Sequence, residues 1–210
     1  MFITFEGPDG SGKTTQIRLL VEWLQELGHA VALTREPGGT EIGDQIRAVV
    51  HDPSNTAIDP RTEILLYSAD RAQHVAECVL PALAKGKVVI SDRYADSTLA
   101  YQGYGRALDL ETLQRITDFA TRRLKPDLTL YLDIAPHVGL QRRQAGGGEW
   151  NRLDAEALEF HQRVRDGYLA LMSGDPDRWV MIDAARSIEE VQADIRACVQ
   201  ARLGKGASNE

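Results

Sequence analysis

A glycine-rich segment near the N-terminus carries the clearest chemical pattern in the chain. It reads Gly7-Pro8-Asp9-Gly10-Ser11-Gly12-Lys13-Thr14 and fits the spacing G-x-x-x-x-G-K-[ST] of a phosphate-binding loop. Glycines let the backbone turn tightly and aim its N–H groups at an anion, and the N-terminus of a following helix adds positive potential. In such a loop the lysine reaches the β- and γ-phosphates and the threonine hydroxyl holds Mg²⁺. The pattern therefore predicts these roles for Lys13 and Thr14.

The residues on either side of this segment supply the context that the pattern requires. Residues 2–5 are a short β-like run, and apolar residues recur at helical spacing after the loop. The apolar residues on that helical face are Ile17, Leu20, Val21, Leu24 and Leu27. A glycine-rich turn with a chance lysine is the alternative, and the strand–loop–helix order disfavours it.

Two charged pairs follow later apolar runs. Arg35-Glu36 follows one β-like run, and Asp92-Arg93 follows another. The carboxyl ends of parallel strands meet at one edge of a sheet, where ligands bind, so we expect both pairs to converge with the phosphate loop. Cations gathered beside phosphates are what phosphoryl transfer requires. For Arg93, an ordinary ion pair with Asp92 is the alternative.

Composition limits the class of protein. The chain has 210 residues, enough for one well-packed α/β domain and short for two. Its net charge of −7 argues against nucleic-acid binding, and no apolar run approaches a membrane span. The N-terminus enters a strand with no signal peptide, and the spacing of Cys78 and Cys198 is not metal-like, so we expect a cytoplasmic protein. The histidines, His51 among them, show no metal spacing and are interpreted as structural.

Predicted strands and helices alternate along the chain. The predicted strands are residues 2–5, 30–34, 87–91, 128–132 and 179–182. This alternation favours a P-loop NTPase-like three-layer α/β sandwich, in which a parallel sheet has helices on both faces. We predict a single domain over residues 1–203 and a frayed tail at residues 204–210.

Local signals also predict helix boundaries. Asp59-Pro60 is an N-cap followed by a proline at the first helical position, and the helix should reach about residue 85 with a kink or a break at Pro81. Other predicted helices cover residues 97–102 and 154–172, and a last one opens at a capping box over residues 187–190.

The residues at the strand ends resemble a known family. Residues 5–15 read Phe-Glu-Gly-Pro-Asp-Gly-Ser-Gly-Lys-Thr-Thr, and residues 34–40 read Thr-Arg-Glu-Pro-Gly-Gly-Thr. Residues 92–94 read Asp-Arg-Tyr, residues 100–103 read Ala-Tyr-Gln-Gly, and residues 126–133 read Pro-Asp-Leu-Thr-Leu-Tyr-Leu-Asp. In this order they resemble the bacterial thymidylate kinases over about residues 1–200. The resemblance implies transfer of the γ-phosphate of ATP to dTMP, a five-stranded parallel sheet, Mg²⁺ dependence and a homodimer.

The resemblance implies a set of residues for the transfer. The implied ATP-binding residues are Gly7, Pro8, Asp9, Gly10, Ser11, Gly12, Lys13, Thr14 and Thr15. The acceptor phosphate is already ionised near neutral pH, so cations are needed to cancel charge and no general base is required. We expect Lys13 to hold the β- and γ-phosphates and Arg93 to bridge the two phosphates that react. Thr14 and Asp92 would hold Mg²⁺, and Asp133 is a rival that the resemblance disfavours.

Arginines flank three consecutive glycines at residues 146–148. Glycines make a hinge, and Arg142, Arg143 and Arg152 could swing over the phosphates as a lid at residues 142–154. A solvated loop is the alternative. In one bacterial type of the family the phosphate loop lacks an arginine and the lid supplies it, and the loop of this chain also lacks one. Arg152 is the first candidate for the catalytic lid arginine, and Arg143 is the second.

The resemblance also implies residues that bind dTMP. They are Asp9, Glu36, Pro37, Arg47, Tyr67, Arg71, Arg93, Ser97, Thr98, Tyr101 and Gln102. Tyr67 and Arg71 lie four residues apart, so they share a helix face. Tyr67 would stack on thymine, although a core aromatic is the alternative, and Arg71 would donate to O4, where cytosine presents a donor. Asp9 would accept from the 3′-hydroxyl or cap its turn, and Tyr101 would crowd the sugar 2′ position.

Two other function classes are alternatives. Another small-molecule kinase with the same fold would share the loop and lid, but not the Tyr67 and Arg71 pair together with Asp-Arg-Tyr. A regulatory GTPase would need an Asn/Thr-Lys-x-Asp motif, which the sequence lacks, and a partitioning ATPase would need an extra lysine early in the loop.

Overall fold

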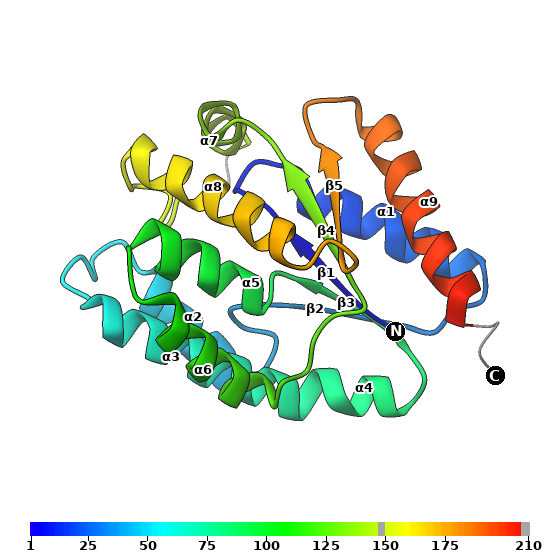
Figure 1. The fold of residues 1–210 in the computed structure, drawn as a ribbon, viewed down its shortest axis with the longest axis horizontal. Coiled ribbons are helices and arrows are strands. Elements are labelled where there is room, and N and C mark those ends of the chain that lie inside the picture. Colours follow the sequence, from blue (N-terminus) through cyan, green and yellow to red (C-terminus); the bar gives the residue numbers. More distant parts are fainter. Residues whose placement is uncertain (147–149, 207–210) are drawn as a thin grey trace.

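The computed structural model describes residues 1–146 and 150–206. Within these residues, five strands form one sheet in the order β2-β3-β1-β4-β5. The strands are β1 (Phe2–Glu6), β2 (Val31–Arg35), β3 (Val88–Asp92), β4 (Leu128–Asp133) and β5 (Trp179–Asp183). All neighbouring pairs are parallel. The predicted five-stranded α/β sandwich is therefore confirmed (Figure 1).

Helices cover both faces of this sheet (Figure 1). They are α1 (Lys13–Glu26), α2 (Glu41–His51), α3 (Pro60–His74), η1 (Val75–Val79), α4 (Leu80–Ala84), α5 (Ala95–Thr98), η2 (Leu99–Gly105), α6 (Leu110–Thr121), α7 (Pro136–Ala145), α8 (Leu158–Gly174) and α9 (Ile188–Gly206). The segments η1 and η2 are π-helical. α1 and α9 pack together on one face, and α3, α5 and α8 lie on the other. In the described part of the chain, no helix is both long and apolar enough to cross a membrane.

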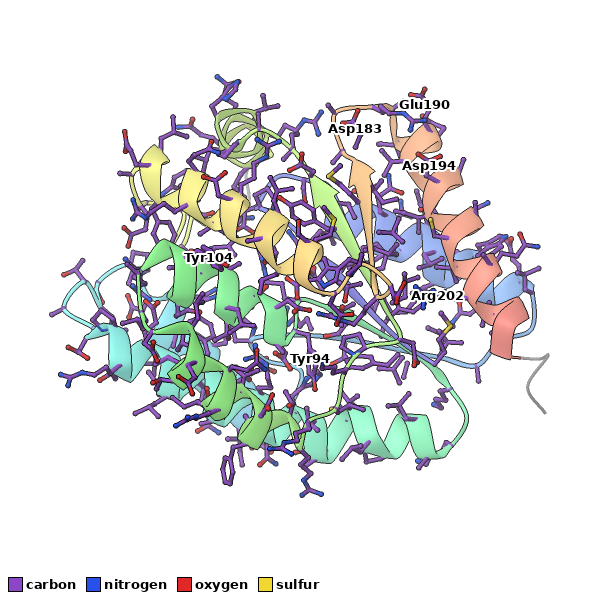
Figure 2. The ribbon with its side chains drawn as sticks, in the orientation of Figure 1. Tyr94, Tyr104, Asp183, Glu190, Asp194 and Arg202 are labelled. Atoms are coloured by element: carbon purple, nitrogen blue, oxygen red, sulfur yellow. The ribbon has the colours of Figure 1, made fainter. Side chains whose placement is uncertain are left out.

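Successive residues of the central strand β1 point into different layers. Ile3 and Phe5 pack with Leu20 of α1 in one apolar cluster. Phe2 packs with Tyr94 in another, with the two ring centroids 4.9 Å apart. Tyr94, labelled in Figure 2, is fully buried and belongs to the same cluster as Val89 of β3. Because side chains alternate along a strand, β1 is buried on both faces, as its apolar run predicts.

The predicted helix caps are present. The Asp59 side chain accepts a hydrogen bond from the backbone N–H of Arg61 at 2.9 Å, and Pro60 is the first residue of α3. Ser187 Oγ accepts from the N–H of Glu190 at 3.3 Å, and the Glu190 carboxylate accepts from the N–H of Ser187 at 3.0 Å. Figure 2 labels Glu190 at the start of α9. Both helix starts are thus determined by local sequence.

The helical run that contains Pro81 is divided, as predicted. It passes from α3 through the π-helical η1 into α4, and Gly86, with φ 70°, lies just beyond its end. Proline has no N–H and cannot complete the α-helical hydrogen-bond ladder. A π-helical segment just before the proline changes that ladder locally.

Two predicted helices have different boundaries in the structure. The helix expected at 97–102 begins at Ala95 and continues as π-helix to Gly105. The helix expected from residue 154 begins at Leu158, because Asn151 Oδ1 accepts from the N–H groups of Leu153 and Asp154 and stabilises a turn.

The C-terminal helix extends into the segment predicted to be a tail. α9 continues to Gly206, beyond the expected domain end at residue 203. Residues 207–210 of the predicted tail lie outside the described residues, as do residues 147–149, which include two glycines of the predicted lid hinge.

Candidate active site

A pocket of about 520 Å³ opens where β1, β2 and β3 end. The predicted site residues that line it are Asp9, Gly10, Gly12, Lys13, Thr14, Thr15, Glu36, Pro37, Arg47, Tyr67, Arg71, Asp92, Arg93, Ser97, Thr98, Tyr101, Gln102 and Arg143. The parallel sheet brings the three charged clusters together at its carboxyl edge, as expected. Gly7, Pro8, Ser11 and Arg152 are outside this lining.

The phosphate loop depends on its glycines for conformation and for close packing. Gly12, the N-cap of α1, has φ 89°, and Gly10 has φ 78°. A Cβ on Gly10 would lie 1.9 Å from the carbonyl oxygen of Gly139 on α7. The loop therefore lies directly against α7, and no larger side chain fits at either glycine of that contact.

Lys13 is buried and held by the loop itself. Its Nζ donates to the carbonyl oxygens of Gly7 at 3.0 Å and Pro8 at 2.9 Å. Burial and the nearby Arg93 lower the pKa of Lys13 to about 8, although Asp9 opposes the shift. Gly7 and Pro8 thus serve the loop by positioning Lys13, which is predominantly charged at neutral pH.

Arg93 is a cation of the pocket that is anchored by several side chains. Its backbone has φ 71°, a left-handed conformation that is rare outside glycine, just after β3. Its Nη2 donates to Asp9 Oδ1 at 3.0 Å and to the Tyr101 hydroxyl at 3.1 Å, while its Nη1 donates to Ser97 Oγ at 3.2 Å. Its guanidinium carbon also lies 5.0 Å from the Tyr101 ring centroid. Arg93 is not paired with Asp92, so the ordinary ion pair considered for it is absent from the described contacts.

Asp9 faces two cations. Burial by itself raises the pKa of Asp9, but the charges of Arg93 and Lys13 outweigh it and hold that pKa well below its usual value. The carboxylate is therefore ionised near neutral pH. It can accept a hydrogen bond from a ligand while it orients Arg93.

Glu6 lies behind Arg93 and was missed by sequence analysis. It is fully buried at the end of β1, where Oε1 accepts from the N–H of Tyr94 at 2.9 Å. Its Oε2 accepts from Ser97 Oγ at 2.6 Å and from the Tyr168 hydroxyl at 2.8 Å. Both hydroxyl oxygens in turn accept from Arg93 Nη1, at 3.2 and 3.3 Å. Glu6 therefore orients two acceptors of Arg93. Burial, and then Asp96, raises the pKa of Glu6 to about 7.

Glu36 pairs with Arg71 of α3. Arg71 Nε donates to Glu36 Oε2 at 2.7 Å, and its Nη1 donates to Thr98 Oγ1 at 2.7 Å. His74 Nδ1 lies 2.8 Å from Glu36 Oε1, and its Nε2 lies 2.6 Å from Thr34 Oγ1. Arg71 is 2 % exposed, and these contacts fix its guanidinium in the pocket wall.

Two tyrosines form the apolar part of the pocket. Tyr67 is 7 % exposed and Tyr101 is 5 % exposed, and both line the pocket from one apolar cluster. The Tyr67 hydroxyl has no hydrogen-bond partner among the described residues. Tyr67 is therefore both a core aromatic and a pocket residue, so the two interpretations of it are compatible.

Gln102 is held by a buried carboxylate behind the pocket. Its Nε2 donates to Glu63 Oε1 at 2.8 Å, and Glu63 is 1 % exposed. Arg106 Nη2 lies 3.3 Å from Glu63 Oε2, and Arg152 also pairs with that oxygen. Sequence analysis missed Glu63, because nothing local marks it as the partner of residues up to 89 positions away.

The helix α2 adds another cation, Arg47. Arg47 Nη1 donates to the carbonyl oxygen of Pro37 at 2.9 Å, so the helix α2 is tied to the β2–α2 loop. His51, interpreted from sequence as structural, also lines the pocket. Burial and Arg47 lower the pKa of His51 to about 4, so it is neutral and adds no charge near pH 7.

The two predicted lid arginines lie in different surroundings. Arg152, the first candidate, is 9 % exposed and lies outside the pocket lining, where its Nε donates to the carbonyl oxygen of Val50 at 3.3 Å and its Nη2 pairs with Glu63. Arg143, the second candidate, lines the pocket and lies 3.4 Å from Asp154 Oδ2. The two arginines differ because the turn at residues 152–157 directs Arg152 inward toward Glu63 on α3.

The described residues contain no group of three or more His, Cys, Asp or Glu that could hold a metal ion alone. Thr14 and Asp92 both line the pocket on the Lys13 side, and their oxygens suit Mg²⁺. Asp133 lies outside the lining, and Arg165 occupies both of its carboxylate oxygens at 2.8 Å. The donor set therefore fits a magnesium ion that takes its remaining ligands from a nucleotide and water, with Asp92 rather than Asp133.

Comparisons with known proteins show the family of the chain. A model of the thymidylate kinase family matches residues 5–195. The thymidylate kinase of Geotalea uraniireducens (strain Rf4) is 52% identical over 210 residues, covering 98% of this chain and 99% of that protein. That of Bacillus pumilus (strain SAFR-032) is 48% identical over 206 residues, covering 98% and 97%.

A solved structure supports the same assignment. The crystal structure of thymidylate kinase from Ehrlichia chaffeensis matches with a TM-score of 0.76 and 34% identity, covering 95% of this chain and 98% of that chain. The family model spans most of the sequence, and the curated relatives cover nearly its full length. The chain belongs to the thymidylate kinase family.

Proposed function

We propose the residue roles through which this chain transfers the γ-phosphate of ATP to dTMP to give dTDP. The observation that carries the assignment is the position of Arg93 in one pocket with Lys13, between the phosphate loop and the helices α5 and η2. A cation at that point lies between a loop built for a triphosphate and the opposite wall, which carries Arg71 and Tyr67.

Charge cancellation explains the transfer. Lys13 leaves the two loop carbonyls and contacts the β- and γ-phosphates, because its ammonium is already adjacent to the loop. Arg93, held by Asp9 and Tyr101, bridges the γ-phosphate and the acceptor phosphate. Arg143 approaches from the lid side. Since the acceptor oxygen is already ionised, these residues align two anions and remove no proton.

Thr14 and Asp92 would hold Mg²⁺, with Asp92 acting directly or through water. A bound magnesium ion supplies neutralisation of phosphate charge and fixes the triphosphate geometry. ATP and Mg²⁺ would use the loop residues from Gly7 to Thr15, whose backbone N–H groups surround the phosphates.

The acceptor site is proposed on the opposite side of Arg93. Tyr67 stacks on thymine, and Arg71 donates to O4 with the two N–H groups that its protein contacts leave available. Ser97, Thr98 and Gln102 line the same wall. The remaining proposed contacts to dTMP come from Asp9, Glu36, Pro37, Arg47 and Tyr101.

A homodimer and a cytoplasmic location are further proposals. α2 packs on α3 and α3 on α6, and together they expose apolar side chains, which supports an interface between two copies. These exposed residues are Ile42, Val49, Leu65, Leu110 and Phe119. Cys78 and Cys198 are free thiols, which supports a reducing compartment.

An assay of ADP release from Mg-ATP tests the proposal. The acceptors are dTMP, dUMP, dCMP and dGMP, each offered separately, and Lys13→Ala is the control. We expect release to require dTMP and to fall at least about 100-fold in the control. Release without any acceptor would indicate a switch ATPase, and release driven by another monophosphate would overturn the roles of Tyr67 and Arg71.

A further inference from the structure

Glu63 is a buried carboxylate that contacts Gln102, a residue of the pocket wall proposed to bind dTMP. It lies on α3, is 1 % exposed and is outside the pocket lining. Its Oε1 accepts from Gln102 Nε2 at 2.8 Å, and Arg106 Nε lies 3.4 Å from the same oxygen. Its Oε2 pairs with Arg152 and with Arg106. Both oxygens are thus surrounded by donors.

This contact determines which end of the Gln102 amide is available to a ligand. An amide has a donor end and an acceptor end, and an ionised carboxylate can only accept. The NH₂ end must therefore face Glu63, since the reverse orientation would set two acceptors against each other inside the protein. No hydrogen bond of Gln102 Oε1 occurs among the described residues, so the carbonyl end is left for the pocket that Gln102 lines.

We propose that Glu63 is a specificity-determining positioning residue, which holds the Gln102 carbonyl toward the acceptor base and thereby selects a base with an N3–H donor. The inference rests on the proposed reading of the base by Arg71 and Gln102. Thymine and uracil carry a donor at N3 and an acceptor at position 4, which match a carbonyl from Gln102 and a guanidinium from Arg71. Cytosine carries the opposite group at each position.

Removal of the Glu63 charge should let the amide rotate. In Glu63→Gln the new side chain can accept or donate, so Gln102 can present its NH₂ to the acceptor N3 of cytosine. One of the two mismatches that exclude cytosine is then relieved, while the mismatch at Arg71 remains. A buried polar mismatch accounts for roughly a 10- to 100-fold difference in selectivity.

The test measures kcat/KM for dTMP, dCMP and dUMP in the full-length enzyme. We expect Glu63→Gln to lower the dTMP-to-dCMP ratio roughly 10- to 100-fold and to leave the dTMP-to-dUMP ratio unchanged, because uracil has the same edge. Gln102→Leu should lower the first ratio as well, and adding Glu63→Gln to Gln102→Leu should lower it no further. Equal losses on dTMP and dCMP in Glu63→Gln would overturn the proposal, since a merely structural role moves both.

Two further variants test whether a change in the ratio comes from a general loss of structure. Glu156→Gln removes another carboxylate from the same network, since Glu156 pairs with Arg106 at 2.6 Å and has no contact with Gln102. It should keep the dTMP-to-dCMP ratio of the wild type, and a fall equal to that of Glu63→Gln would overturn the proposal. If Glu63→Gln does not fold, Glu63→Asp is measured instead. This variant keeps the charge, but its carboxylate is one methylene farther from Gln102, so the dTMP-to-dCMP ratio should fall. An unchanged ratio in that variant would also overturn the proposal.

The variants distinguish the role of Glu63 from the proposed recognition of the base by Gln102. If Gln102→Leu leaves the dTMP-to-dCMP ratio unchanged, the proposed reading of the base is wrong and this inference is wrong with it. If Gln102→Leu lowers the ratio and neither Glu63 variant does, only the role of Glu63 is wrong.

Discussion

Arg143 and Arg152 lie on the same lid segment but have different surroundings. Arg143 lines the pocket with a side chain that is 28% exposed, whereas Arg152 is buried on Glu63. Arg152 is itself a buried cation, so its replacement leaves a cavity and removes one of the two arginines on Glu63, whereas the part-exposed Arg143 faces the pocket. Replacement of Arg143 should therefore affect mainly kcat, and replacement of Arg152 should affect mainly the free energy of unfolding.

We expect Arg143→Ala to lower kcat at least about 100-fold, because one cation at the transferred phosphate is lost. Arg152→Ala should instead lower the free energy of unfolding by about 3 kcal/mol. Steady-state kinetics and urea unfolding of both variants measure these effects. A large loss of kcat in Arg152→Ala at unchanged stability, with Arg143→Ala active, would restore the order expected from sequence.

Asp70 is a buried carboxylate whose pKa is shifted, and it forms no ion pair among the described residues. Its Oδ1 accepts from the N–H of Gly38 at 2.8 Å, and its Oδ2 has no partner among the described residues. Burial, and then Glu36, raises the pKa of Asp70 to about 7. The folded state thus keeps a proton that the unfolded state has released, so this residue makes the free energy of unfolding fall as pH rises from about 4 to about 7.

We expect Asp70→Asn to remove that pH dependence. The amide stays neutral, so the gain in unfolding free energy over wild type should be larger near pH 8 than near pH 5, by about 2 kcal/mol. Urea unfolding of both proteins at the two pH values measures it. An equal change at the two pH values would mean that the pKa of Asp70 is not raised.

At the scale of elements, the contact of the phosphate loop with α7 positions the loop. A Cβ on Gly139 would lie 2.6 Å from the carbonyl oxygen of Asp9, so a larger residue there must push the loop. A displacement of about 1 Å at a reacting group can lower a rate by about 100-fold. α7 thus positions the phosphate loop, in addition to carrying Arg143.

Gly139→Ala should lower kcat/KM for ATP roughly 10- to 100-fold while dTMP binding to the free enzyme is unchanged. Gly174→Ala is the matched control, because a Cβ at that helix end meets no atom within 4 Å. Kinetics with ATP and calorimetry with dTMP measure the two effects. Equal activity of the two variants would show that the loop tolerates the shift.

At the scale of the whole molecule, several exposed apolar side chains lie on one helical layer, formed by α2, α3 and α6. Phe119 on α6 is 87% exposed and Leu65 on α3 is 58% exposed, and these two helices pack against each other (Figure 1). Large exposed apolar side chains gathered on adjacent helices are typical of an interface. The same layer includes α3, which carries Tyr67 and Arg71, so an interface there would support the acceptor site.

We expect Phe119→Asp to convert a dimer into a monomer, since an unpaired carboxylate in an apolar interface is strongly unfavourable. Leu27→Asp is the control, because Leu27 is 55% exposed at the end of α1, on the other face of the sheet. Sedimentation velocity measures both. A wild-type monomer, or a Phe119→Asp dimer, would contradict the proposed interface.

Much of the fold could be predicted because its signals are local. The glycine spacing of the phosphate loop, the capping box at Ser187 and the N-cap at Asp59 each depend on residues within one turn. Boundaries were wrong where a side chain formed a turn that periodicity does not reveal, as Asn151 does before α8. Most pocket residues were foreseen from the family resemblance, and the three charged clusters were foreseen because strand ends converge in a parallel sheet.

The sequence by itself determined the nucleotide loop, the parallel α/β sheet and the set of side chains at its carboxyl edge. Only the tertiary structure decided which charges pair: Arg152 with Glu63, Arg71 with Glu36, and Glu6 with the hydroxyls that hold Arg93. Spacing along the chain sets backbone conformation and the face on which a residue lies. Partners 35 to 162 positions apart are chosen by packing between elements, which local spacing does not encode.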